Sequence, residues 1–317
     1  MLARTVILML ALAGFALATA LAVAQPQTQP ATASRPGKTD WMHKAKWGVM
    51  IHAGSTLPKG TWAQAMDGFD VAALARQAHE VGAGYLMITS IHAEHPIAPS
   101  AVYEKRFPGK CPKRDLIVEL ADELAKYDLP LMLYFNTNIK WKPNDADVQF
   151  HADMLKEFSL RYGTKVKGWW FDNSFARHDP AMKIDAARNT AFQKLIAEAA
   201  RAGNPNANLG FSPPHGTQRN TPFDDYTAGN LHKLNNVVCP GRFVDGCQWH
   251  TLCYLGTTWG SARPRYQGDE ATVITKRLTD AGGAVTWDCP HDTKGRLTDA
   301  IVAQLKAVGK ATGTLRQ

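Results

Sequence analysis

The chain has 317 residues, of which 45% are hydrophobic and 20% charged; this composition is that of a globular protein and excludes a largely disordered one. The formal net charge is +8, but the basic residues are spread along the chain without a long run, so nucleic acid is not an expected partner. Five cysteines without a C-x-x-C pair fit neither a small disulfide-rich scaffold nor a cysteine-based metal site.

The amino-terminal segment has the three parts of an export signal. Arg4 supplies a positive charge, residues 6–20 are apolar and uncharged, and A-V-A at 22–24 forms a small-residue cleavage site. We therefore expect residues 1–24 to be a signal peptide and the mature protein to be secreted or periplasmic, with no transmembrane span. The alternative is a segment that stays uncleaved as a membrane anchor.

The next segment, residues 25–40, is rich in Pro, Gln, Thr, Ala and Ser and has almost no large apolar side chain. Such a segment buries too little surface to offset the entropy lost on ordering, which predicts a disordered tether. The rest of the chain, residues 41–317, is long enough for one large domain.

Within this domain, short apolar runs alternate with longer amphipathic stretches, starting with an expected strand at 47–52 and a helix at 70–81. Further strands are expected at residues 85–91, 129–136, 166–172, 208–212, 235–239 and 283–289. Further helices are expected from about residue 114 and at 148–162, 181–201, 270–281 and 297–308. Strands separated by helices form parallel sheets, and about seven such units favour an α/β fold of the (β/α)₈ TIM-barrel type. A G-x-G-x-x-G turn is missing after the first strand, so no dinucleotide cofactor is expected.

In a barrel of this type the functional residues lie at the carboxyl ends of the strands and in the loops that follow. The polar and aromatic residues at those positions are His52, His92, Glu94, His95, Tyr134, Asn136, Trp170, Asp172, Trp287 and Asp288. We expect six of them to converge on one pocket: His52, His92, Tyr134, Trp170, Asp172 and Trp287.

Asp172 is the strongest candidate for a reacting group. It ends the aromatic run W-W-F-D at 169–172, and strand alternation places it on the same face as Trp170, an acid beside a ring that can stack on a sugar. A pair of carboxylates is the usual equipment of a glycosidase. The alternative is a structural role, in which Asp172 caps the next helix or pairs with Arg177.

The stretch H-A-E-H at 92–95 could also be interpreted as a metal site. On an extended chain, however, His92 and Glu94 face one way and His95 the other, which makes a poor set of three ligands. We therefore expect no metal and favour hydrogen bonding of His92 to sugar hydroxyls, with a structural histidine as the alternative.

Two other residue types are informative. Five of the nine tryptophans fall in loops or at strand ends, where they either stack on sugar rings or form the core of the loop layer: Trp62, Trp141, Trp249, Trp259 and Trp287. The export route would permit one disulfide, which we expect within the group Cys239, Cys247 and Cys253.

Motifs in the first half of the chain have counterparts in a known family. W-G-V-M-I-H-A-G at 47–54 resembles F-G-x-F-x-H-W-G, and G-T-W at 60–62 resembles G-E-W. The run from Gly82 to His92 resembles A-G-A-K-Y-x-x-L-T-x-K-H. R-D-L at 114–116 matches the R-D-L at a helix start of the family, and L-Y-F-N at 133–136 resembles its strand x-Y-Y-S. W-F-D at 170–172 is identical to the W-F-D of the family. In the second half, Q-W-H-T-L-C at 248–253, T-W-G at 258–260 and G-G-A-V-T-W-D-C-P at 282–290 resemble W-E-T-C, S-W-G-Y and G-G-N-L-L-L-N-x-G-P. In this order, the motifs resemble those of the α-L-fucosidases of glycoside hydrolase family 29.

The resemblance implies a retaining glycoside hydrolase acting on a glycan through the nucleophile Asp172, with no cofactor, on a single barrel without the C-terminal β-sandwich that many members carry. For the second carboxylate the sequence has no matching T-x-E motif; our first candidate is Asp225, followed by Asp224 and Glu94. The residues expected to bind the substrate are His52, Trp62, His92, Glu94, Tyr134, Trp170, Trp249, His250 and Trp287.

Two departures from the family pattern keep other hypotheses open. H-A-E-H-P at 92–96 stands where the family has H-H-D-G-F, and His250 replaces the glutamate of W-E-T-C. The main alternative is a non-catalytic carbohydrate-binding barrel that has lost its acid–base residue. A third hypothesis is a metal-dependent hydrolase that uses His92 and His95.

Overall fold

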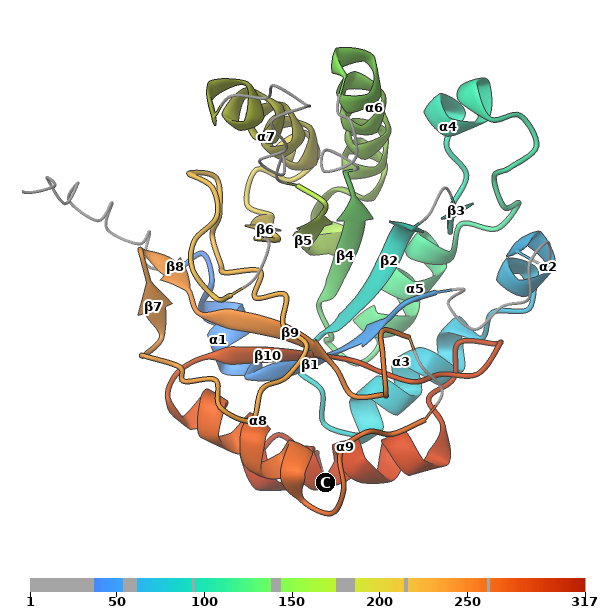
Figure 1. Cartoon of the computed structure of the whole chain (residues 1–317). Helices are drawn as coiled ribbons and strands as arrows, with labels where there is room; N and C mark the ends of the chain where they lie inside the picture. Colours follow the sequence, from blue (N-terminus) through green and yellow to red (C-terminus); the bar gives the residue numbers. More distant parts are fainter. Residues whose placement is uncertain are drawn as a thin grey trace, which may run out of the picture. The chain divides into compact units, whose positions relative to one another are not determined.

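Within the described part of the chain, seven parallel strands form one curled sheet in the computed structural model of the protein (Figure 1). The structure describes residues 37–53, 62–92, 95–137, 144–174, 186–213, 216–260 and 263–316. The parallel strands are β1 (Trp47–Ile51), β2 (Leu86–His92), β4 (Leu131–Asn136), β5 (Val166–Asp172), β6 (Asn208–Phe211), β9 (His250–Tyr254) and β10 (Ala284–Asp288). Their order in the sheet is β6-β5-β4-β2-β1-β10-β9, and the short β3 (His95–Pro96) pairs with β2 in the antiparallel sense. A small hairpin of β7 (Phe243–Val244) and β8 (Cys247–Gln248) lies outside this sheet.

Helices follow most strands and lie around the outside of the curled sheet (Figure 1). They are α1 (Asp40–Ala45), α2 (Trp62–Asp67), α3 (Val71–Glu80), α4 (Ala101–Arg106), α5 (Leu116–Ala125), α6 (Asp145–Tyr162), α7 (Ala186–Arg201), α8 (Glu270–Asp280) and α9 (Asp299–Thr312), with a 3₁₀ turn at Gly163–Lys165. Aspartates fix two of the predicted starts: the carboxylate of Asp70 accepts from the Ala73 N–H at 2.9 Å, and that of Asp115 from the Val118 N–H at 3.1 Å. No helix among the described residues is long and apolar enough to cross a membrane.

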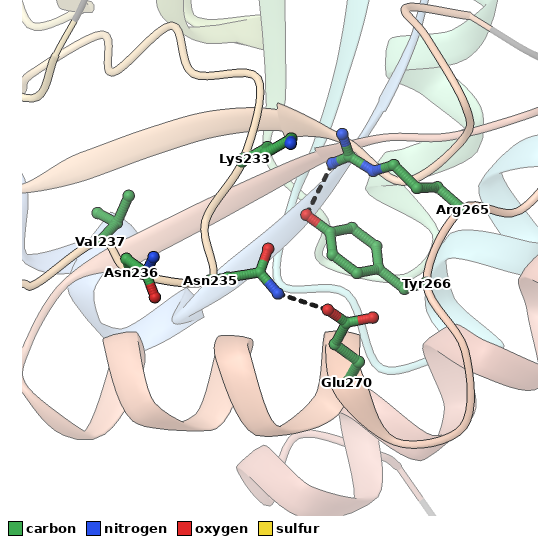
Figure 2. Close-up of a pocket in the computed structure, with 7 residues that line it drawn as sticks. All are labelled: Lys233, Asn235, Asn236, Val237, Arg265, Tyr266 and Glu270. Atoms are coloured by element: carbon green, nitrogen blue, oxygen red, sulfur yellow. Dashed lines mark hydrogen bonds between the residues drawn. The ribbon is translucent and has the colours of Figure 1, made fainter.

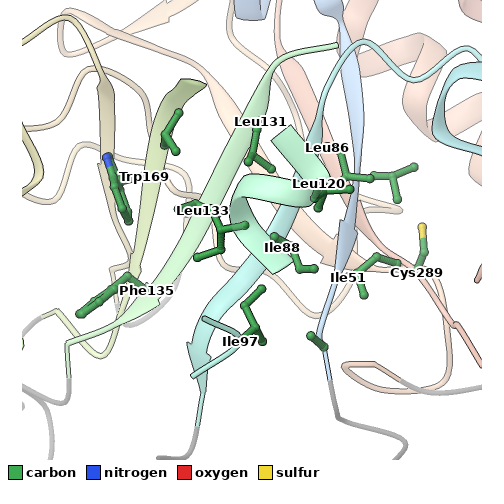
Figure 3. Close-up of a cluster of buried hydrophobic side chains, with 14 of the residues drawn as sticks. Ile51, Leu86, Ile88, Ile97, Leu120, Leu131, Leu133, Phe135, Trp169 and Cys289 are labelled. Atoms are coloured by element: carbon green, nitrogen blue, oxygen red, sulfur yellow. The ribbon is translucent and has the colours of Figure 1, made fainter. Parts of the chain in front are cut away.

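Alternation along the strands divides the buried side chains into two cores. The outer core, between sheet and helices, includes Ile88, Leu133 and Phe135 (Figure 3). The inner core, enclosed by the curled sheet, is rich in methionine and aromatic side chains: Met50, Tyr85, Met87, Met132, Tyr134, Trp170, Tyr226 and Leu252. A sheet packed on both faces in this way is typical of a TIM-like barrel, whose interior is filled by side chains.

Two glycines make room for large rings in the inner core. A Cβ on Gly48 would lie 2.3 Å from the ring of Tyr85, and a Cβ on Gly210 would lie 2.6 Å from the ring of Tyr226. The Tyr226 hydroxyl donates to the Trp169 carbonyl at 2.8 Å, so its polar end is satisfied inside the protein.

Residues 225–231 bond to both outer strands of the sheet. The Asp225 N–H donates to the Leu209 carbonyl of β6 at 2.8 Å, and the Leu252 N–H of β9 donates to the Gly229 carbonyl at 2.9 Å. Single parallel bridges join this segment to the β8–β9 region at Gln248 and at Leu252. The backbone of β6 and β9 is therefore partnered even though the segment forms no regular strand.

Two sequence predictions are corrected by the structure. No strand forms at 235–239, where Asn235 and Asn236 form a turn and the side chain of Val238 is 75% exposed; the sheet is continued instead by β9. The expected disulfide is also wrong, because all five cysteines are free. The thiols of Cys239 and Cys247 each donate instead to a nearby backbone carbonyl at 3.2 Å.

Candidate functional site

A cavity of about 160 Å³ opens where several of the parallel strands end. It is lined by His52, His92, Tyr134, Trp170, Asp172, Asn230, Leu252 and Trp259. Five of the six residues expected to converge are therefore brought together, from the ends of β1, β2, β4 and β5. The sixth, Trp287, lies elsewhere.

The Asp172 carboxylate is held by the neighbouring strand. Asp172 and Asn136 are register partners on β5 and β4, and the Tyr134 hydroxyl donates to Asp172 Oδ2 at 2.7 Å. Burial and the negative charge of Asp172 raise the pKa of Tyr134 well above its usual value, so this hydroxyl keeps its proton. The Tyr134 ring stacks on Trp170 with centroids 5.1 Å apart. The carboxylate thus stands at the rim of an aromatic wall, as alternation predicted.

The chain turns sharply immediately after Asp172. Asn173 has φ +50°, a left-handed conformation that asparagine tolerates better than most residues, and its side-chain amide donates to Asn136 Oδ1 at 3.0 Å. The Thr137 hydroxyl donates to the Asp172 carbonyl at 2.9 Å. These bonds fix the end of β5 and with it the direction of the carboxylate.

His52 forms an ion pair with Asp288. The two lie on the adjacent strand ends of β1 and β10, with His52 Nδ1 2.8 Å from Asp288 Oδ1, and the Gly260 N–H donates to Asp288 Oδ2 at 2.6 Å. Burial opposes charge on His52, but attraction to Asp288, the hydrogen bond with it and attraction to Asp172 outweigh burial and raise the pKa of His52. The pocket therefore favours the protonated form of the His52 imidazole, near the Asp172 carboxylate.

His92 is the second histidine of the pocket, and its ring centroid lies 5.5 Å from that of His52. Burial and repulsion from His52 lower the pKa of His92 despite attraction to Asp172. The pair therefore combines one imidazole whose protonated form is favoured with one whose neutral form is favoured, so that together they can donate to and accept from hydroxyl groups.

The ring of His95 is engaged in a stacking contact. His92 and His95 face each other across the antiparallel β2–β3 pair, and the His95 ring stacks on Trp62 with centroids 4.9 Å apart. Among the described residues no group of three metal-binding side chains occurs. Trp62 itself donates to the Pro96 carbonyl at 3.0 Å and does not line the pocket, while Glu94 lies outside the described residues.

Asn230, Trp259 and Asp288 belong to the site, although none of them is among the six residues expected to converge on it. The Asn230 amide donates to the Ser212 hydroxyl at 3.2 Å, while its buried Oδ1 has no hydrogen-bond partner in the described structure. The Trp259 ring lies 5.8 Å from His52. Strand alternation could have identified Asp288, because it is the register partner of Met50, which shares its face with His52.

Asp225 lies at the opposite end of the strands from Asp172. Its carboxylate accepts from the Leu209 N–H at the start of β6 at 2.9 Å and pairs with Lys38 at 2.8 Å and with Arg201 at 2.9 Å. This position argues against the acid–base role expected for Asp225. It also shows that Lys38, predicted to lie in a disordered tether, is anchored to the domain.

Asp224 is likewise engaged in the fold. Its buried carboxylate accepts backbone N–H groups of Phe211 at 2.7 Å, Thr221 at 2.7 Å and Asn220 at 2.9 Å. Burial raises its pKa to about 7, and the three backbone N–H bonds oppose this shift. Asp224 does not line the pocket, so its position supports a structural role in the loop.

Three further residues expected to bind substrate are fully buried away from the pocket. Trp249 packs against Gly283, and the Trp287 indole donates to the Thr275 hydroxyl of α8 at 2.9 Å, which places both in the outer core. His250 begins β9 inside the sheet and bonds Thr286 Oγ1 at 2.7 Å. Burial lowers the pKa of His250 to about 4, so it is a neutral core residue.

The model of the α-L-fucosidase family matches residues 59–313, which is most of the chain. No curated protein matches the sequence. Residues 59–313 include every residue of the pocket except His52, which lies just before this range.

Several solved structures share the fold. A variant of an endo-fucoidan hydrolase of glycoside hydrolase family 107 has a TM-score of 0.69 and 18% identity, covering 86% of this chain and 53% of its own. A family 29 α-L-fucosidase from Bacteroides thetaiotaomicron, trapped as a covalent intermediate with 2-fluoro-fucosyl fluoride, has a TM-score of 0.66 and 16% identity over 89% and 75% of the two chains. The α-L-fucosidase AlfC from Lactobacillus casei, in complex with α-L-fucose, has a TM-score of 0.63 and 18% identity over 87% and 98%. The chain spans about half the length of the fucoidan hydrolase it resembles, and at these identities the likeness supports the fold alone.

Proposed function

This chain belongs to the α-L-fucosidase family of glycoside hydrolases, and on that premise we propose that it removes a terminal α-L-fucosyl residue from a glycan with retention of configuration. The observation that carries the proposal is the Asp172 carboxylate, held by Tyr134 in a pocket that also contains His52 and His92. Carboxylate, imidazole and aromatic groups converging at strand ends are the equipment of a sugar site.

The proposed mechanism has two steps. Asp172 Oδ attacks the anomeric carbon, the glycosidic bond breaks and the aglycone leaves with a proton from a general acid. Water then attacks the anomeric carbon of the glycosyl–Asp172 ester, loses its proton to the same group, and frees the sugar and the carboxylate. Tyr134 orients the nucleophile through its 2.7 Å bond, and His52 and His92 bind the sugar hydroxyls.

The general acid is the one role for which the described lining of the pocket offers no carboxylate besides Asp172. Asp225 and Asp224 are engaged elsewhere, and Asp288 is buried in its pair with His52. Glu94, which follows His92 by two positions in the chain, is the remaining sequence candidate and lies outside the described residues.

The proposal is tested with an aryl α-L-fucoside that has an activated phenol as its leaving group. Such a substrate needs little protonation, so we expect the protein to release the phenol even if its general acid is weak. Glu94→Gln should slow an alkyl fucoside much more than the aryl fucoside if Glu94 is the acid. The second candidate function is a non-catalytic sugar-binding barrel, and the observation that favours it is that the described lining of the pocket holds no second carboxylate. Binding of fucose without release of phenol from any aryl glycoside would support this candidate.

A finer proposal concerns the amino-terminal segment. We propose that residues 1–24 direct export and are removed. Amino-terminal sequencing of the exported protein should then begin at Gln25, and a protein that keeps Met1 would contradict this.

We also propose that residues 225–231 occupy the place of the eighth strand of the barrel. Their hydrogen bonds to β6 and β9 support this role.

A further inference from the structure

A second and larger cavity, of about 630 Å³, lies apart from the catalytic pocket and shares no lining residue with it. It is bordered by the loop after residues 225–231 and by the start of α8 (Figure 2). Its polar lining consists of Lys233, Asn235, Asn236, Arg265, Tyr266 and Glu270. Nothing in the proposed catalytic mechanism uses these residues.

Arg265 is held rigidly in the wall of this cavity. Its guanidinium donates to the Tyr266 hydroxyl at 2.7 Å, the Tyr254 carbonyl at 2.8 Å and the His232 carbonyl at 2.6 Å. It also lies 4.1 Å from the ring centroid of Tyr254 and 4.5 Å from that of Tyr266. All these partners are neutral, so the contacts fix the position of the positive charge without cancelling it.

Lys233 adds a second positive charge to the same cavity. Within the described part of the chain neither Lys233 nor Arg265 forms an ion pair with a carboxylate, although fifteen ion pairs occur elsewhere in it. In the view of Figure 2 both cationic groups lie toward one side of the cavity. Two unpaired cations beside one cavity favour an anionic ligand.

The other side of the cavity is suited to hydroxyl groups. The Asn235 amide donates to a carboxylate oxygen of Glu270, which leaves the second oxygen and the side chain of Asn236 as hydrogen-bonding groups (Figure 2). Glu270 is the one acidic residue of the lining and would oppose an anion placed next to it. A ligand that carries its charge at one end and hydroxyls at the other fits this arrangement.

Partly exposed aromatic rings connect the two cavities. Trp259 lines the catalytic pocket, its ring lies 4.9 Å from that of Tyr254, and Tyr254 lies under the guanidinium of Arg265 in the second cavity. His232 borders the same path, with its ring 6.1 Å from that of Trp259. Such rings are suited to stacking on successive sugars, so one glycan could occupy both cavities.

We propose that the second cavity binds an anionic sugar residue of the glycan whose terminal fucose occupies the catalytic pocket. The inference rests on the proposed function for the identity of the glycan, but the charge and lining of the cavity carry it independently. The anionic group is a sulfate ester or a carboxylate, since both offer oxygen acceptors to Lys233 and Arg265.

The test uses Lys233→Glu, a charge reversal in an exposed loop, with Lys306→Glu on the exposed face of α9 as the matched control. Binding to dextran sulfate, polygalacturonate and uncharged dextran is measured at one fixed ionic strength. We expect Lys233→Glu to weaken binding of an anionic polymer about tenfold more than Lys306→Glu does, with no change for dextran. Loss with dextran sulfate alone assigns a sulfate ester, and loss with polygalacturonate alone assigns a carboxylate.

A second variant, Glu270→Gln, should strengthen binding of the same anionic polymer, because it removes the opposing charge and keeps an acceptor for Asn235. Equal losses for Lys233→Glu and Lys306→Glu would mean that the net charge of +8 attracts the polymers without a site, and would overturn the inference. Turnover of the aryl fucoside should stay within about twofold in all three variants. An inactive wild-type protein with the expected binding pattern would refute the proposed hydrolase activity and leave the anionic site standing.

Discussion

Asp172→Ala should lower kcat for an aryl α-L-fucoside by about 10⁴-fold or more, the scale reached when a member of a covalent catalytic unit is removed. The variant has no carboxylate to form the glycosyl ester, while the remaining pocket still binds the sugar. The fold should persist because Asp172 stands at the pocket rim and its carboxylate accepts one hydrogen bond in the described structure, that of the Tyr134 hydroxyl. The measurement is steady-state release of the phenol, with circular dichroism to confirm folding.

Azide and a matched aspartate variant make this result specific. Azide should restore part of the turnover of Asp172→Ala by entering the vacated space and attacking the anomeric carbon, giving a fucosyl azide. Asp225→Asn should keep near wild-type turnover but lose about 2 kcal/mol of unfolding free energy, since it weakens charge-assisted bonds to Lys38 and Arg201. Full activity in Asp172→Ala would refute the nucleophile assignment, and an inactive but stable Asp225→Asn would return Asp225 to the catalytic machinery.

Local rules predicted the part of the site that lies on regular strands. The end of a strand determines where along the barrel axis a side chain lies, and alternation determines which face of the sheet it points from. His52, Tyr134 and Asp172 could therefore be placed in one pocket from the sequence. Strand alternation, applied strictly, would have placed Asp288 in the pocket instead of its neighbour Trp287. Adjacent residues of a strand face opposite sides of the sheet, and Trp287 faces α8.

Strand ends and alternation gave wrong positions for residues outside the predicted strands. Asp225 lies in a segment without a regular strand, whose course is set by hydrogen bonds to β6 and β9, elements distant in sequence. Trp249 and His250 come immediately before or at the start of β9, and no strand was predicted there. Because a residue at the beginning of a strand lies at the opposite end from the catalytic face, missing β9 placed both residues at the wrong end.

Asp288→Asn should lower kcat/KM for the aryl fucoside by about 10- to 100-fold near pH 7, because it removes the negative charge that raises the pKa of His52. In the native protein the pKa of His52 is raised, so the cationic form is present below that pKa and is lost as the pH rises through it. In the variant, burial still opposes the charge but attraction to Asp288 is gone. The pKa of His52 must therefore fall, and the alkaline loss of activity should move to lower pH.

The readout is the pH profile of kcat/KM, because a merely structural loss would scale the whole curve without moving its alkaline limb. Asp292→Asn is the matched control: this carboxylate follows β10, pairs with Arg296 at 2.7 Å and does not line the pocket, so its profile should match that of the native protein. Asparagine at position 288 can satisfy the His52 ring or the Gly260 N–H through its single oxygen, but its amide cannot accept from the other. An alkaline limb that stays in place in Asp288→Asn would show that His52 does not act as a cation in sugar binding.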